Sequence, residues 1–304
     1  MKILITGGAG FIGSHTADAL LNAGHTVRIL DNLHTGSLDN IPAGAQFVQG
    51  DITNGETANV AAQGCDAILH LAALVSVPQS LSQPVETFQV NTVGTINMLE
   101  AARTNGVKRF MLASTCAIYG SSAGRKGEDS PVDPLVPYAS SKLMAEEAGR
   151  SYAAAFGLEF VAVRYFNVYG PRQRADSPYS GVVARWCDAA KANKPCLVFG
   201  DGEQTRDFVS VYDVARANAR MATTPIAELS HRLYNVGTGQ SVSLNTLLQS
   251  LGEAAGSGAV TVEYREARAG DIRESAGVAD RLRGLGWRPS VSLVDGLREL
   301  VIGR

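Results

Sequence analysis

The chain has 304 residues, with 27 Lys and Arg side chains against 29 Asp and Glu side chains, and its formal net charge is −2. A hydrophobic content of 45% excludes an intrinsically disordered chain. The lack of a basic excess excludes an electrostatic nucleic-acid-binding protein. No stretch approaches the roughly 18 to 20 consecutive apolar residues of a membrane span, and the N-terminus resembles no secretory signal, so we expect a cytoplasmic protein without a membrane partner.

Short apolar segments recur up to residue 165, at residues 3–6, 27–30, 47–48, 67–71, 110–114 and 160–164. Their continuous apolar character is typical of strands that are covered on both faces. Longer helical patterns lie between them, at residues 13–23, 85–105 and 140–156. This alternation predicts an α/β fold with a doubly wound parallel (Rossmann) sheet.

The pattern changes after Gly170-Pro171, where short strand candidates at residues 197–199, 208–210 and 260–264 mix with helices. We therefore predict a larger lobe over residues 1–169 and a smaller mixed lobe over residues 170–304, with an interleaved boundary. The charged run from Arg125 to Asp129 predicts a solvated loop. The four cysteines form no Cys-x-x-Cys pair and lie far from the histidines in sequence, which predicts neither a metal site nor a disulfide.

A glycine-rich segment joins the first predicted strand to the first predicted helix. It reads Gly7-Gly-Ala-Gly10-Phe11-Ile12-Gly13. Glycines allow a tight turn whose backbone N–H groups can approach a pyrophosphate at the start of a helix. Asp31 ends the next predicted strand, where a carboxylate accepts hydrogen bonds from ribose hydroxyls and repels a 2′-phosphate. The sequence thus predicts a dinucleotide site that prefers NAD over NADP.

Three further residues predict a catalytic site beside that cofactor. Tyr138 and Lys142 are one helical turn apart and share a face, so the ammonium can lie near the phenol. Because a phenol has a pKa of about 10, a tyrosine base requires its pKa to fall toward neutrality. Thr115 follows the strand at residues 110–114, on the edge of the sheet that faces the ligand. Together these residues predict hydride transfer to or from a substrate alcohol.

Ten motifs in this order resemble the extended short-chain dehydrogenases, and within them the nucleotide-sugar 4-epimerases of the UDP-galactose type. They are Thr6 to Gly13, Asp31-Asn32, Asp51-Ile52, His70 to Ala73, Asn91 with Gly94-Thr95, Ser114-Thr115 with Tyr119-Gly120, Tyr138 to Lys142, Arg164 to Asn167, Arg206 to Phe208 and Arg268 to Asp271. The resemblance runs almost end to end. It implies that the larger lobe binds NAD, that the smaller lobe binds a UDP-sugar, and that the reaction is an epimerisation at C4.

The same resemblance implies the site residues. The residues expected to bind NAD are Gly7, Gly10, Phe11, Ile12, Gly13, Asp31, Asn32, Gly36, Asp51, Ile52, Leu71, Ala72, Ala73, Asn91, Ser114, Tyr138, Lys142 and Phe166. Those expected to bind the substrate are Asn167, Val198, Arg206, Arg268, Asp271 and Ser275. Ser275 takes the position that lines the sugar pocket, and its small side chain predicts that both plain and N-acetylated UDP-hexoses are accepted.

Two other enzyme reactions and one non-enzymatic role stay open. Family members that are dehydratases or decarboxylases carry a carboxylic acid between the Thr and the Tyr-Gly, whereas this chain has Cys116 and Ala117 there. This favours the epimerase over a dehydratase or a decarboxylase, whereas a 4-reductase stays open, and we expect Cys116 to be a packed thiol. A non-catalytic NAD-sensing scaffold is the third alternative, although it has no need of Tyr138 and Lys142. Family members usually form dimers through two helices of the larger lobe, so a homodimer is expected.

Overall fold

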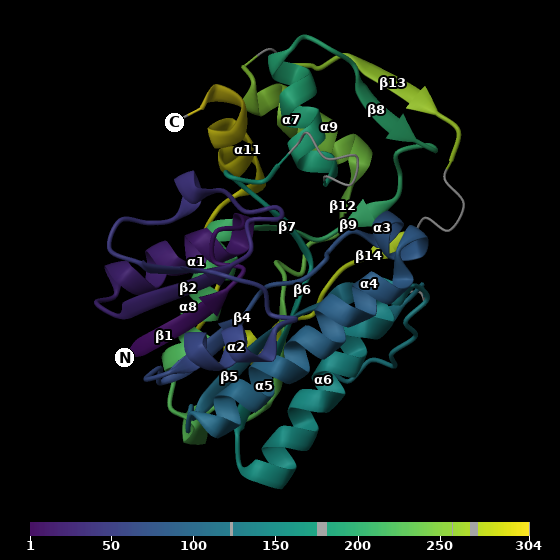
Figure 1. The fold of residues 1–304 in the computed structure, drawn as a ribbon. Coiled ribbons are helices and arrows are strands. Elements are labelled where there is room, and N and C mark those ends of the chain that lie inside the picture. Colours follow the sequence, from purple (N-terminus) through teal and green to yellow (C-terminus); the bar gives the residue numbers. More distant parts are fainter. Residues whose placement is uncertain (122–123, 175–180, 257, 268–272, 304) are drawn as a thin grey trace.

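The computed structural model describes residues 1–121, 124–174, 181–256, 258–267 and 273–303. Its main sheet consists of β1 (Lys2–Thr6), β2 (Thr26–Asp31), β3 (Gln46–Gln49), β4 (Ala67–His70), β5 (Arg109–Thr115), β6 (Glu159–Tyr165) and β11 (Leu233–Val236). All seven strands are parallel, in the spatial order β11-β6-β5-β4-β1-β2-β3. Figure 1 labels β1, β2, β4, β5 and β6 of this sheet. The order reverses between β1 and β4, and ligands of such sheets bind outside the strand ends at that reversal.

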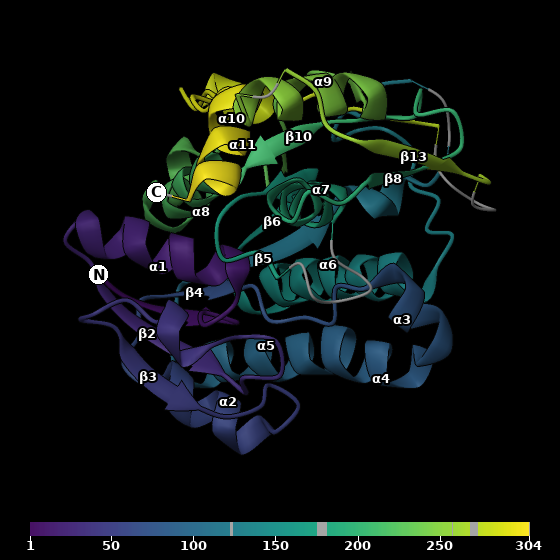
Figure 2. The same ribbon diagram turned by 90° about the horizontal axis from the view of Figure 1, so that it is seen from above.

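Helices cover both faces of this sheet (Figure 2). One layer contains α1 (Phe11–Asn22) and α8 (Val211–Thr223), and the other contains α2 (Gly55–Ala62), α5 (Gly94–Thr104) and α6 (Pro137–Phe156). Alternate residues of β1 serve the two layers, because successive side chains of a strand point to opposite faces. Ile3 and Ile5 belong to the apolar cluster with α1 and α8, whereas Leu4 belongs to the cluster with α2, α5 and α6. The predicted α/β fold is confirmed.

Two predicted helices differ from the observed ones. The pattern at residues 140–156 begins earlier, because Pro137 takes the first helical position, where its missing N–H costs nothing. The pattern at residues 85–105 divides into α4 (Pro84–Phe88), a π-helical segment (Gln89–Val93) and α5. Asn91 lies in that segment, where its side chain bonds both backbone groups of Leu74. A short helix, α3 (Val77–Ser82), precedes them.

The smaller lobe has its own apolar core, which includes Trp186, Leu247, Leu251 and Leu297. Its helices are α7 (Val182–Lys191), α9 (Leu244–Ala254) and α11 (Leu293–Ile302). Its short strands form three small sheets, from β7 (Asn167–Tyr169) with β10 (Phe208–Ser210), from β9 (Thr205–Arg206) with β12 (Val242–Ser243) and β14 (Glu274–Ser275), and from β8 (Cys196–Phe199) with β13 (Val262–Arg265).

The chain passes between the two parts of the molecule more than once. After residue 170 it supplies α8, β11 and α10 (Asp280–Gly284), of which β11 pairs with β6 in the main sheet. Leu282 of α10 is buried in the same apolar cluster as Ile3. The division into a cofactor lobe and a substrate lobe at residue 169 stays a prediction.

The prediction of a solvated loop at residues 125–129 was wrong for two of its charged side chains, Lys126 and Glu128, although Arg125 and Asp129 are exposed. Lys126 is 5% exposed and Glu128 is 8% exposed. The backbone N–H of Asn235 donates to Glu128 Oε1 at 3.0 Å, and the Asn235 side-chain amide donates to the Lys126 carbonyl at 3.0 Å. The run lies against β11, a strand far along the chain, and a charge pattern read locally carries no sign of that contact.

Within the residues that the structure describes, no helix combines the length and the apolar character needed to cross a membrane.

Candidate functional site

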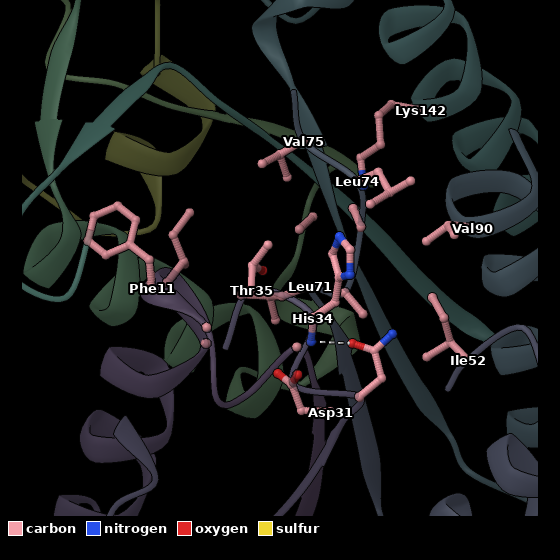
Figure 3. A pocket seen from close by; sticks show the side chains of 18 of the residues that line it. Phe11, Asp31, His34, Thr35, Ile52, Leu71, Leu74, Val75, Val90 and Lys142 are labelled. Carbon is pink, nitrogen blue, oxygen red and sulfur yellow. Dashed lines mark hydrogen bonds between the residues drawn. The ribbon is translucent and has the colours of Figure 1, made fainter. Parts of the chain in front are cut away.

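A cavity of about 500 Å³ runs along the carboxyl ends of the central strands, a volume typical of small-molecule and cofactor sites (Figure 3). Most of the residues predicted to bind the cofactor line it: Gly7, Gly10, Phe11, Ile12, Gly13, Asp31, Asn32, Asp51, Ile52, Leu71, Ala72, Ala73, Ser114, Tyr138, Lys142 and Phe166. Thr115 lines it too. Figure 3 shows Asp31 and Lys142 at opposite ends of the group of side chains.

The glycine turn leaves its backbone open to this cavity. Gly7 has φ +69°, and a Cβ on Gly13 would lie 2.1 Å from the Gly7 carbonyl oxygen, so neither position tolerates a side chain without a shift. Helix α1 follows with Gly10 as its N-cap and no side-chain cap. Since the first N–H groups of a helix have no partner within the helix, this end of α1 can bind an anion such as a pyrophosphate.

Asp31 connects the glycine turn to the loop that follows β2. Its carboxylate is 7% exposed and accepts hydrogen bonds from the backbone N–H of Ala9 at 3.0 Å and of Leu33 at 2.8 Å. A carboxylate has about four acceptor positions, so lone pairs remain for hydroxyl groups of a ligand. Asn32 donates from its side chain to Asp51 at 2.8 Å, which joins two further lining residues.

A buried hydrogen-bond chain holds the strand end beside the turn. Thr95 donates to the carbonyl of Asn91 at 2.6 Å, so its oxygen accepts from His70 Nε2 at 3.0 Å. His70 Nδ1 then accepts from Thr6 at 2.7 Å, and the Thr6 oxygen accepts from the backbone N–H of Ala72 at 3.2 Å. Burial lowers the pKa of His70 to about 3, so the imidazole is neutral, in the tautomer that this chain requires. The chain fixes Ala72 in the cavity wall.

The three predicted catalytic residues meet at the other end of the cavity. Tyr138 is 9% exposed and Lys142 3%, and the two side chains lie one turn apart on α6. Burial raises the pKa of Tyr138 to about 12, against a hydrogen bond with Thr115 that lowers it. Burial also lowers the pKa of Lys142 to about 8, against the nearby charge of Glu146 that raises it. Burial therefore favours the neutral phenol of Tyr138, whereas Lys142 still carries its proton at neutral pH, and the base strength of Tyr138 depends on that positive charge beside it.

Comparison with known proteins shows which family the chain belongs to. The model of the NAD dependent epimerase/dehydratase family matches residues 3–237. The chain belongs to this family. The UDP-glucose 4-epimerase of Mycolicibacterium smegmatis is 37% identical over 99% of this chain and 97% of its own length.

Two solved structures share the whole fold with this member of the epimerase/dehydratase family. The UDP-glucose 4-epimerase of Thermotoga maritima, solved with UDP-glucose, has a TM-score of 0.92 and is 36% identical over 99% of this chain and 98% of its own. The UDP-glucose 4-epimerase of Thermus thermophilus, solved with NAD, has a TM-score of 0.91 and is 38% identical, with the same shares covered. The resemblance to this family and the fold class predicted from the sequence are both confirmed.

Among the described residues, no group of three or more His, Cys, Asp or Glu side chains is arranged to hold a metal ion.

Several predicted binding residues of this family member lie away from the cavity lining. The Asn91 side chain is hydrogen-bonded to the backbone of Leu74 and to Ser141. Gly36 lies so close to Ala9 that a Cβ on it would be 2.9 Å from the Ala9 Cβ. Val198 is fully buried in the core of the smaller lobe. The roles assigned to these residues stay predictions.

The substrate candidates Asn167, Arg206 and Ser275 lie on small strands and are not among the residues that line the cavity. Ser275 pairs with Arg206 between β14 and β9, and Asn167 pairs with Phe208 between β7 and β10. The Ser275 side chain lies near the thiol of Cys116, the residue after Thr115, and against the larger effect of burial its influence lowers the pKa of that thiol. Arg268 and Asp271 lie outside the described residues. Burial raises the pKa of Cys116 to about 11, so its thiol is protonated.

The sequence missed several lining residues and the supports behind them. His34 and Thr35 follow β2, and Leu74 and Val75 follow β4. Glu86 lies on α4 and Val90 in the π-helical segment. Their only signal was proximity to a recognised motif. Asp207, fully buried, accepts hydrogen bonds from the backbone N–H groups of Thr238, Gly239 and Gly277, which gathers the loops of the smaller lobe. No local sequence pattern predicts these contacts of Asp207, because they join segments that are far apart in the chain.

Proposed function

We propose that this protein catalyses the NAD-dependent 4-epimerisation of a UDP-hexose through a transient 4-keto sugar. The observation that carries the proposal is the meeting of Thr115, Tyr138 and Lys142 at one end of a cavity whose other end is a glycine turn. The three relatives described above are UDP-glucose 4-epimerases, which supports the same reaction.

The lining fits NAD. The uncapped start of α1 and the crowded glycine turn suit a pyrophosphate, and the Asp31 carboxylate suits ribose hydroxyls. When bound, NAD supplies a hydride acceptor that returns the same hydride, so the net redox change is zero.

Each of the three catalytic side chains has a separate task in the proton transfers. Tyr138 as phenolate takes the proton of the sugar 4-hydroxyl, and Thr115, whose side chain lies near Tyr138, holds that hydroxyl in place with a hydrogen bond. Lys142 supplies positive charge that favours the phenolate over the phenol. The keto sugar then turns about its link to the diphosphate and presents its other face, and Tyr138 returns the proton to the inverted C4 oxygen.

The turn after β5 argues against loss of water or of a carboxylate. Cys116 and Ala117 occupy the positions where those reactions need a carboxylic acid. Neither can protonate a leaving hydroxyl, since the Cys116 thiol holds its proton with a pKa of about 11. An epimerase needs no further acid.

A chromatographic screen tests the proposal. The purified protein is incubated with UDP-glucose, UDP-galactose and their N-acetylated counterparts, and the products are resolved. We expect an isomer of the same mass, reached from either side of a pair. A product that has lost water or gained two hydrogens would replace the epimerase by a dehydratase or a reductase. Binding of NAD without turnover of any nucleotide sugar would favour the sensing scaffold.

The choice of cofactor gives a second prediction. We expect NAD to raise the melting temperature of the protein more than NADP does at the same concentration, because the Asp31 carboxylate repels a 2′-phosphate. A thermal shift series over both dinucleotides measures this. Asp31→Asn keeps the hydrogen-bonding shape without the charge and should narrow the difference between them. Equal stabilisation of the wild type by NAD and NADP would contradict the preference.

Substrate size gives a third prediction. We propose that Ser275, adjacent to Cys116 and across from Arg206, leaves room for an N-acetyl group. Ser275→Tyr should lower turnover of the N-acetylated pair by roughly tenfold or more and spare the plain hexoses. Ser275→Ala, which only removes the hydroxyl, is the matched control and should keep both. An equal loss on both pairs in the tyrosine variant would argue against a gate.

We also propose that the protein forms a homodimer through α4, α5 and α6. Large apolar side chains on these helices are exposed: Val85 81%, Ile96 38%, Met144 52% and Phe156 57%. They do not face the sheet, and such patches commonly mark protein contacts. Light scattering of the purified protein measures the state, and a monomer at micromolar concentration would contradict the proposal.

A further inference from the structure

A buried ion pair lies behind the catalytic lysine, among residues that have no role in the proposed mechanism. Glu146 follows Lys142 by one turn of α6 and is fully buried, and Arg164 on β6 is 2% exposed. Arg164 donates through Nε to Glu146 Oε1 at 2.9 Å and through Nη2 to Oε2 at 2.7 Å. Ser114 donates to the same Oε1 at 2.6 Å. The carboxylate is therefore held from two strands as well as from its own helix.

Arg164 is itself held on its far side. Its guanidinium carbon lies 4.8 Å from the centre of the Tyr119 ring, and the Tyr119 hydroxyl donates to Asn235 of β11 at 2.8 Å. A buried ion pair is weak evidence for stability, because removing both charges from water costs as much as their attraction returns. Stability alone therefore does not explain why so many contacts fix the Glu146 carboxylate, which indicates an effect of its charge on a neighbouring group.

That effect is on the charge of Lys142. The other groups around the lysine supply little compensating negative charge. On β4, His70 is neutral, with its pKa lowered to about 3 by burial and by Lys142 itself. Tyr138 on α6 is neutral as a phenol, with its pKa raised to about 12 by burial, and so is the Cys116 thiol after β5, with its pKa raised to about 11.

Two charged groups lie further out. Arg150 approaches Glu146 Oε2 at 3.5 Å from the half-exposed surface of α6. Glu86 of α4 lines the cavity but is exposed, so water screens its charge. Burial lowers the pKa of Lys142 to about 8. The negative charge of Glu146 acts in the opposite direction and raises that pKa.

We propose that Glu146 is a positioning residue for the reaction, whose carboxylate, fixed by Arg164 and Ser114, keeps Lys142 positively charged where Tyr138 must act as the base. This inference rests on the proposed function, since it assigns Lys142 the same task. It adds that the charge of the lysine is set from the side of the protein core, through a contact between α6, β5 and β6. Without it, Lys142 would lose its proton near neutral pH and Tyr138 would lose its positive partner.

The decisive variant neutralises the pair without leaving a lone charge. Glu146→Gln alone would leave Arg164 buried and unpaired, so the test is the double variant Glu146→Gln with Arg164→Gln, in which two amides replace the two ions. We expect the alkaline limb of its pH profile for kcat to lie about one pH unit or more below that of the wild type. Glu147→Gln, the same charge change on the neighbouring exposed position of α6, is the matched control and should leave the limb in place.

A second measurement does not depend on turnover. The pH titration of the Lys142 side chain, followed by NMR of isotope-labelled lysine and assigned with Lys142→Arg, should show the ammonium persisting through neutral pH in the wild type. In the double variant the midpoint should move down together with the alkaline limb. A Lys142 that is already neutral in the wild type at neutral pH would overturn the inference even if the double variant failed to fold.

The outcomes separate this inference from the proposed function. A wild type without epimerase activity would refute the function, and the lysine titration would still test the role of Glu146. A double variant that folds and loses activity equally at every pH, with the lysine titration unmoved, would show that Glu146 serves the fold alone. Glu146→Asp, which keeps the charge, should keep the wild-type limb whatever its effect on the rate.

Discussion

Tyr138→Phe should lower kcat by about 10² to 10⁴-fold while the protein remains folded and binds NAD. The change removes the proton acceptor of the reaction, and general-base catalysis contributes on that scale. The side chain keeps its ring and nearly all of its buried volume, because only the phenolic oxygen is removed. Steady-state assays with the substrate that the chromatographic screen identifies measure the loss, and dinucleotide titration checks the cofactor site.

Tyr169→Phe is the matched control for that variant. Tyr169 is also buried, but it packs in the smaller lobe and its hydroxyl reaches the carbonyl of Ser292 at 3.4 Å. Its removal should cost about 1 kcal/mol of stability or less and leave kcat in place. If Tyr138→Phe retained wild-type turnover, another group would have to be the base, and the assignment built on Tyr138 and Lys142 would fail.

Gly13→Ala should reduce the affinity for NAD by roughly 100-fold or more and lower the melting temperature. The added Cβ would lie 2.1 Å from the Gly7 carbonyl oxygen and 2.8 Å from Gly8 Cα, which are backbone atoms of the turn itself. The turn must open to relieve that contact, so the N–H groups at the start of α1 move away from a bound pyrophosphate. Overpacking of this kind costs about 1–3 kcal/mol in stability. Calorimetric titration with NAD and thermal unfolding measure the two effects.

Gly284→Ala gives the comparison that separates a crowded glycine from an ordinary one. Gly284 ends α10, and a Cβ there meets nothing within 4 Å, so alanine should be neutral or slightly stabilising. Gly13→Ala with wild-type affinity for NAD would mean that the glycine turn is not where the pyrophosphate binds.

The parts of the site that sequence predicted are those encoded by local spacing. Gly7, Gly10 and Gly13 are close in sequence because one turn needs them, and Tyr138 and Lys142 are close because one helical turn brings them to the same face. Strand ends are local too, so Asp31 and Thr115 could be placed at the sheet edge before the structure was known. These residues all line the cavity.

The supports of the site could not be predicted because they join distant segments. Glu146 meets Arg164 and Ser114 only once α6 packs on β5 and β6. Burial keeps His70 neutral, and its hydrogen bonds with Thr6 and Thr95, which come from different elements, fix its tautomer. In a single sequence, a buried charge of this kind looks like any surface charge.

The loop at residues 125–129 shows the same limit from the opposite side. Its composition is that of a surface turn, yet Glu128 accepts the backbone N–H of Asn235, and both Glu128 and Lys126 are buried. Local charge density predicted solvation, and a long-range contact overrode it. The correct reading needed the position of a strand more than a hundred residues later, as the separation of 107 residues in that hydrogen bond shows.

The pairing of β11 with β6 bears on how the polypeptide matures during translation. The strands from β1 to β6 leave the ribosome first, and until residues 233–236 follow, β6 presents a free row of N–H and C=O groups. A nascent chain halted before that point would expose β6 as an unpaired edge strand, which can pair with a strand of another chain. Once β11 pairs, the outermost strand on this side of the sheet has four residues instead of the seven of β6, and a short edge strand limits pairing with another chain.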